Sequence, residues 1–160
     1  MIASPYADDL ARIPVREHHA LVRGSDTAWW EYGPADAPVL VLVHGFRGDH
    51  HGLEPVVAQL PGFRIVSPDL PGFGESATFT ARPHDIDAYA EWLGAFIRAI
   101  GIDGPYTLLG HSFGSIVAAN AVARGLGAVD VGAVLADGDA SELLVVGGGD
   151  HVPVILRRVA

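Results

Sequence analysis

The clearest pattern in the sequence is a series of short apolar runs separated by turns that contain glycine and proline. The run Val39–Val43 is apolar at every position, which predicts a strand buried on both faces of a sheet. Residues 63–67 and 106–109 predict two further strands. Between them, residues 85–100 carry apolar side chains at a spacing of about 3.6 residues. This spacing predicts an amphipathic helix, with Asp85 as its N-cap and Gly101 as its stop.

The remaining elements follow from the same patterns. Residues 17–23 and 27–32 flank the turn-like Gly24-Ser25-Asp26 and predict an opening antiparallel hairpin. We further expect helices over 53–60 and 115–124, strands over 131–136 and 143–146, and the start of a helix over 153–159. Alternating strands and helices of this size predict an α/β fold, with a mostly parallel sheet and helices on both faces.

Residues able to do chemistry follow the ends of these predicted strands. In an open α/β sheet, ligands bind beyond the carboxyl ends of the strands. We therefore expect one rim of the sheet to gather His44-Gly45-Phe46, the loop that begins at Asp69, Ser112, Asp137 and Asp150.

Composition narrows the function classes. The 160 residues are 49% hydrophobic and carry a formal charge of −9, which fits one globular domain and no nucleic-acid partner. All ten basic residues are arginine, so Schiff-base chemistry and a lysine-dependent phosphate loop are excluded. Cysteine is absent, which excludes disulfides and thiolate sites. No signal peptide or apolar stretch of membrane-spanning length is evident, so we expect a cytoplasmic protein without a membrane partner.

The most specific motif is Gly110-His111-Ser112-Phe113-Gly114, which has the pattern G-x-S-x-G. A predicted strand precedes it and a predicted helix follows it, the setting in which a serine hydroxyl is exposed at a tight turn. The setting predicts that Ser112 is a nucleophile. His111 is expected to point away from the turn and to pack.

Three motifs together resemble the α/β-hydrolase family: Val43-His44-Gly45-Phe46, the segment 69–76 that begins Asp69-Leu70-Pro71-Gly72, and the serine motif. They stand in the family's order and cover about residues 17–136. The resemblance implies an acyl-enzyme mechanism without a cofactor, with the N–H groups of Phe46 and Phe113 as oxyanion donors. It also implies one domain over 1–160: an N-terminal extension 1–16, a hairpin 17–32, a core 39–136, and an acid-bearing strand with the start of a helix over 143–160.

The resemblance leaves the other members of a catalytic triad open. Asp150, after the strand predicted over 143–146, stands where the family carries its acid; Asp137 is the alternative, and Asp139 is less well placed. His151 is the only histidine after Ser112, and His84 is a second candidate base. Relative to the family, the chain is expected to be truncated: it lacks the cap domain and the final strand with its histidine. The Asp69 loop is expected to shape the rim rather than to react.

The histidine-rich loop raises the possibility of a metal site, but its spacing argues against one. His44, Asp49, His50 and His51 are near one another in sequence, but consecutive residues are expected to point in different directions, and a tetrahedral site needs convergent ligands. We therefore expect no metal.

Two functions remain open. The first is a serine hydrolase acting on a small carboxylic ester or related acyl substrate; the second is a non-catalytic domain or a fragment of a longer hydrolase. A serine nucleophile argues against the family's dehalogenases and epoxide hydrolases, which use an aspartate. The apolar strand at 143–146 would also leave a sheet edge open to self-association.

Overall fold

The fold was determined as a computed structural model, which describes residues 4–125, 133–136 and 142–144; of the last two segments only the backbone is discussed. The strands are β1 (Val15–Val22), β2 (Ser25–Tyr32), β3 (Val39–Val43), β4 (Arg64–Pro68), β5 (Tyr106–His111), β6 (Ala133–Ala136) and β7 (Glu142–Leu144). The helices are α1 (Ala7–Leu10), the 3₁₀ turn η1 (His50–Leu53), α2 (Glu54–Ala58), α3 (Ile86–Ala99) and α4 (Phe113–Ala123).

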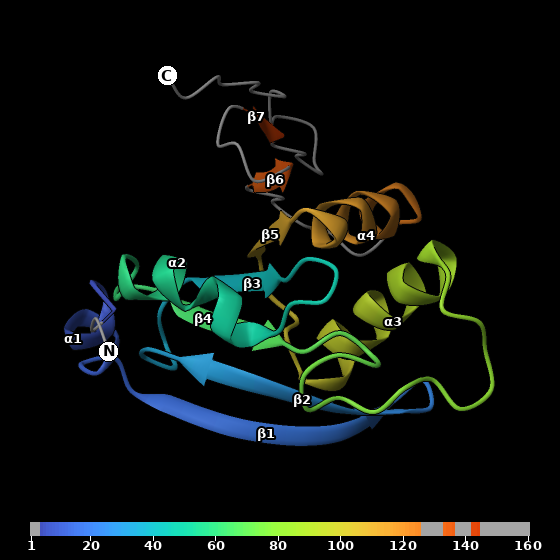
Figure 1. The fold of residues 1–160 in the computed structure, drawn as a ribbon, viewed down its shortest axis with the longest axis horizontal. Helices are drawn as coiled ribbons and strands as arrows, with labels where there is room; N and C mark the ends of the chain where they lie inside the picture. Colours follow the sequence, from blue (N-terminus) through green and yellow to red (C-terminus); the bar gives the residue numbers. More distant parts are fainter. Residues whose placement is uncertain (1–3, 126–132, 137–141, 145–160) are drawn as a thin grey trace.

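The strands form one twisted mixed sheet in the order β1-β2-β4-β3-β5-β6-β7 (Figure 1). The central strands β4, β3, β5 and β6 run parallel, as the apolar runs predict. The hairpin β1–β2 joins them antiparallel through β2 and β4. The predicted α/β fold class is therefore confirmed, with antiparallel pairs added at both ends of the parallel core.

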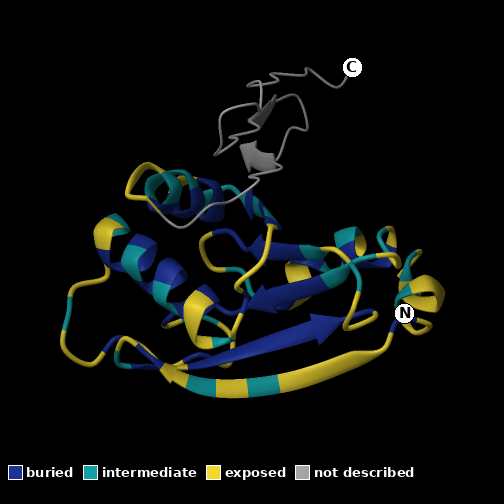
Figure 2. Ribbon diagram, turned by 180° about the vertical axis from the view of Figure 1, so that it is seen from behind, coloured by how far each residue is buried: buried dark blue, intermediate teal, exposed yellow. Residues whose placement is uncertain are grey.

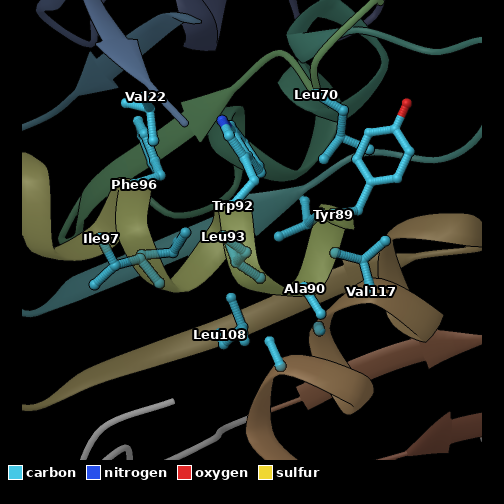
Figure 3. Packing of buried hydrophobic residues seen from close by; sticks show 14 of the residues in the cluster. Val22, Leu70, Tyr89, Ala90, Trp92, Leu93, Phe96, Ile97, Leu108 and Val117 are labelled. Carbon is cyan, nitrogen blue, oxygen red and sulfur yellow. The ribbon is translucent and has the colours of Figure 1, made fainter. Parts of the chain in front are cut away.

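Apolar side chains cover both faces of the sheet. On one face, α3 and α4 pack on alternate residues of the central strands, including Val41, Val43 and Leu108. Figure 3 shows part of this cluster, in which Trp92, Leu93 and Phe96 project from α3. On the other face, η1 and α2 pack on Leu40 and Leu42. The core strands are dark blue in Figure 2, whereas β1 is mostly exposed at the edge.

Local signals set most boundaries. The Oδ1 atom of Asp85 accepts the Ala88 N–H at 2.8 Å, which confirms the predicted N-cap of α3, and Gly101 after the helix has φ +72°. The hairpin turn lies one residue earlier than expected, at Arg23 and Gly24, which both have positive φ as a two-residue turn requires. The helix expected over 53–60 is divided into η1 and α2. None of the described helices is long and apolar enough to cross a membrane.

The last described strand, β7, runs antiparallel to its neighbour in the sheet. It pairs with β6 so that Ala136 faces Glu142 and Val134 faces Leu144. Only residues 137–141 separate the two strands. A parallel crossover needs about a dozen residues or more. The connection is therefore too short for a parallel strand, and β7 runs away from the rim where β6 ends.

Candidate active site

Ser112 lies on a sharp turn between β5 and α4, with φ +51° and ψ −118°. Residues with a Cβ rarely adopt this conformation, and holding one there costs on the order of 1–3 kcal/mol. The turn is tied down at its exit, where the backbone N–H and the hydroxyl of Ser115 both donate to the Ser112 carbonyl. This strained strand-to-helix corner is the geometry predicted for a nucleophile.

Both glycines of the motif are required by close backbone contacts. A Cβ added to Gly110 would lie 2.5 Å from the carbonyl oxygen of Gly114. A Cβ added to Gly114 would collide with the carbonyl oxygens of Val43 and His44 at the end of β3. The turn can therefore sit against β3 only with glycine at both positions.

The loop after β3 presents its backbone to the same corner. A Cβ placed on Gly45 would lie 3.2 Å from the Cβ of Ser112. Buried His44 accepts the Leu70 N–H at its Nε2 (2.8 Å), so its Nδ1 carries the proton and donates to the Gly45 carbonyl at 2.8 Å. Burial lowers the pKa of His44, although the hydrogen bond to Gly45 opposes this, and the ring is neutral at pH 7.

Holding the Gly45 carbonyl also orients the next N–H. The Gly45–Phe46 peptide is trans, so the Phe46 N–H points opposite to the carbonyl that His44 and the Gly48 N–H bind. Phe113 is the first residue of α4, where helix N–H groups lack an intrahelical acceptor. Among the described residues, neither N–H donates a hydrogen bond. Both N–H groups are therefore unpaired within the described part of the chain.

The Asp69 loop supports this rim without facing it. The buried Asp69 carboxylate accepts the His50 backbone N–H at 2.7 Å, His50 Nδ1 at 3.0 Å, and the Glu75 N–H at 2.8 Å. Burial raises the pKa of this carboxyl, but the hydrogen bonds from His50 and Glu75 outweigh it, and the net pKa lies below the usual value. These contacts agree with the structural role expected for the loop.

Aromatic side chains surround the corner. The Phe46 ring is 65% exposed and meets Phe113 edge-on with ring centroids 6.0 Å apart. Phe73 contacts Phe46 at 5.5 Å, and Tyr89 contacts Phe113 at 5.4 Å. Sequence reasoning missed Phe73 and Tyr89, because their apolar neighbours only indicated a turn and a helix core. Ser112 itself is half-buried.

The structure brings Ser112, Phe46 and Phe113 together, but it describes none of the predicted acids or the predicted base. Asp137, Asp139, Asp150 and His151 lie outside the described residues. Their placement at the rim therefore stays a prediction.

Two described histidines remain to be placed: His84, the second candidate base, and His111, which lies within the serine motif. His84 donates through Nδ1 to the Tyr89 hydroxyl at 2.8 Å, and that hydroxyl donates to the Pro71 carbonyl at 2.9 Å. His111 packs beside Gly45, as the hypothetical Gly45 Cβ would lie 3.0 Å from its Nδ1. No histidine of the described part of the chain forms a hydrogen bond with Ser112.

Comparison with known proteins identifies the family. Residues 38–134 match the model of the alpha/beta hydrolase fold. The chain belongs to this family. This match covers β3 through the start of β6 and includes all three sequence motifs. The earlier resemblance is therefore confirmed.

Individual relatives of this α/β hydrolase carry several names. It is 32% identical over 111 residues to the magnesium-chelatase 30 kDa subunit of Rhodobacter capsulatus, covering 68% of this chain and 39% of the relative. It is 35% identical over 103 residues to a bifunctional esterase/perhydrolase of Acinetobacter calcoaceticus, covering 63% and 37%. The structure of a naproxen esterase from Bacillus subtilis matches with a TM-score of 0.68 and 25% identity, covering 78% of this chain and 45% of that one. The chain thus spans less than half the length of these relatives.

Proposed function

We propose that this α/β hydrolase is a serine hydrolase that cleaves carboxylic esters or related acyl compounds, with Ser112 as the nucleophile. The observation that carries the proposal is the strained turn at Ser112, which lies beside the Phe46 and Phe113 N–H groups; neither donates a hydrogen bond to any residue that the structure describes. Strained backbone conformations such as that of Ser112 cluster at functional sites, where the strain is part of the mechanism. Relatives named as esterases support the ester class.

The proposed chemistry is acyl transfer in two steps. The Ser112 hydroxyl oxygen attacks the carbonyl carbon of the ester, its proton passes to a general base, and the negative charge on the carbonyl oxygen is stabilised by the Phe46 and Phe113 N–H groups. The bond to the leaving alcohol breaks as the base returns the proton to it. Water then hydrolyses the acyl-enzyme. From the family resemblance, Asp150 is the proposed acid, with Asp137 as the alternative. His151 is the proposed base because it is the only histidine after Ser112.

A fluorophosphonate probe tests the nucleophile. We expect one adduct per chain on the peptide that contains Ser112, located by mass spectrometry, and no adduct in Ser112→Ala. The fragment spectrum separates Ser112 from the neighbouring Ser115. An unlabelled Ser112, under conditions that label an active serine hydrolase, would refute the proposal.

The second candidate is a non-catalytic domain of the same family, and one observation favours it. Within the described residues no histidine forms a hydrogen bond with Ser112. Loss of one triad member removes most of the catalysis that a serine provides. Hydrolysis of a p-nitrophenyl ester separates the two candidates. Turnover that disappears in Ser112→Ala excludes the non-catalytic reading, whereas equal rates for both chains favour it.

A further inference from the structure

A cluster of possible metal ligands lies outside the Ser112 site. His50 and His51 of η1 and Glu54, the first residue of α2, each offer a ligand atom, and the three atoms lie within 4.8 Å of one another. The sequence argument against a metal assumed that consecutive histidines point apart. In the structure the two imidazole rings are neighbours, with centroids 4.0 Å apart. That premise is wrong for His50 and His51.

We propose that His50, His51 and Glu54 bind one divalent transition-metal ion of the Zn²⁺ type. Two imidazoles and one carboxylate are a donor set that such ions favour. The three residues lie within five consecutive positions, from the start of η1 to the start of α2. Their side chains can therefore converge on one ion without ordering a long loop. The site lies on the face of the sheet covered by α2, whereas α4, which carries the serine motif at its start, covers the other face.

His50 is held in the state that a metal ligand needs. It is 3% exposed, and its ring is stacked on Trp30 with the planes 14° apart. Its Nδ1 lies 3.0 Å from Asp69 Oδ1, a carboxylate that can only accept, so Nδ1 carries the proton and Nε2 keeps its lone pair. Among the described residues, Nε2 has no hydrogen-bond partner. A carboxylate that fixes the far nitrogen of a histidine is the usual outer support of a metal ligand.

The space beside the cluster fits an open coordination position. His50, His51 and Glu54 line a hollow of about 520 Å³ together with Trp30 and Tyr32. Helix α1 closes the far side of this hollow, and α1 and α2 lie next to each other in Figure 1. His51 Nδ1 and Glu54 Oε1 are 2.9 Å apart, so only a proton now lies between them. Zinc sites with an open coordination position typically have three protein ligands and a water molecule as the fourth ligand.

A second trio gives the matched control. Glu17, His19 and Glu75 also place ligand atoms within 4.8 Å of one another, but all three are exposed. The His19 ring lies 3.3 Å from Glu17, itself a member of this trio, and its other nitrogen lies 4.0 Å from Asp26. Both distances are longer than the 3.0 Å between His50 and the buried Asp69. If adventitious surface binding were the whole effect, this trio would bind as well as the proposed one.

The test is a titration of the untagged 160-residue chain with Co²⁺, followed by its visible absorption, with Zn²⁺ added afterwards as competitor. We expect one Co²⁺ per chain with the intense bands of a four- or five-coordinate ion, displaced by Zn²⁺. Loss of a supporting partner alone weakens metal sites by about 10–100-fold. We therefore expect at least this weakening in His51→Gln and in Glu54→Gln, and unchanged affinity in His19→Gln.

Circular dichroism of each variant checks that the fold is intact. We expect His51→Gln to fold, because the His51 side chain is 66% exposed. Absence of saturable Co²⁺ binding, equal affinity in His51→Gln, or loss of binding in His19→Gln alone would each overturn the proposal. The measurement is independent of hydrolysis, so it stands apart from the fluorophosphonate result.

Discussion

The substitution Gly114→Ala tests whether glycine is needed at the nucleophile turn for steric reasons, because alanine favours the helix but adds a Cβ. Gly114 is the second residue of α4, and its φ is not positive, so alanine suits the backbone and would by itself favour the helix by about 0.5–1 kcal/mol. The new Cβ, however, would lie less than 3.0 Å from the carbonyl oxygens of Val43 and His44. These are backbone atoms of the central parallel strand and its exit, so they cannot rotate away as a side chain can.

We expect Gly114→Ala to lower the free energy of unfolding by about 2–3 kcal/mol, the upper part of the range for overpacked interiors. Gly104→Ala is the matched control, because a Cβ there meets nothing within 4 Å. Alanine at that position should be neutral or stabilising by up to about 1 kcal/mol. Urea unfolding followed by fluorescence of the buried Trp29, Trp30 and Trp92 measures both. Equal midpoints for the two variants would refute the steric reasoning.

Four further predictions rest on single features. Ser112→Gly should be more stable than Ser112→Ala, because relief of about 1–3 kcal/mol of backbone strain exceeds the ~0.5–1 kcal/mol entropy cost of glycine; urea unfolding that ranks them the other way contradicts this. The folded pKa of Asp69 is lowered, so its stabilisation is present above the unfolded pKa of about 3.9 and is lost as the pH falls through the folded pKa. Asp69→Asn should therefore cost about 1–3 kcal/mol at pH 7 and flatten the acid limb of a stability–pH curve, whereas the exposed Asp103→Asn should do neither. Burial, opposed by Arg98, raises the pKa of Tyr106 to about 12. The stabilisation from the neutral phenol is therefore full below about pH 10 and falls as the pH rises towards 12. In an ultraviolet titration, Tyr106→Phe should show one late-ionising phenol fewer than the parent chain. Pairing through the β7 edge of the sheet should give a dimer or larger species by size-exclusion chromatography with light scattering, and a monodisperse monomer contradicts it.

The parts of the fold that sequence predicts well are those fixed by neighbours along the chain. The apolar runs predicted β3 and β4, and the N-cap at Asp85 predicted the start of α3. The motif around Ser112 predicted the strained corner, because two glycines beside a serine between a strand and a helix have few other uses. Helix α4 begins at Phe113 rather than 115, since the helix starts directly from the turn.

What sequence reasoning missed depends on contacts between distant segments or on chain direction. The His44 hydrogen bond to Leu70 and the Asp69 hydrogen bonds to His50 join different loops, and no periodicity reveals them. The antiparallel direction of β7 was not predicted, although the connection after β6 is too short for a parallel crossover. The stacking of His50 on Trp30 depends on the loop after β3 folding back over β2, which the sequence pattern does not show.

The strand order has a consequence for the order of folding during synthesis. The hairpin β1–β2 needs only its own two-residue turn, so it can form as soon as residue 32 leaves the ribosome. Its partner in the sheet, however, is β4 rather than β3, and β3 must be flanked by both β4 and β5 before its edges are paired. Contacts between segments so far apart along the chain form slowly. We therefore expect the nascent hairpin and β3 to remain open to chaperones until β5 is made, and the corner at Ser112 to be among the last features to form.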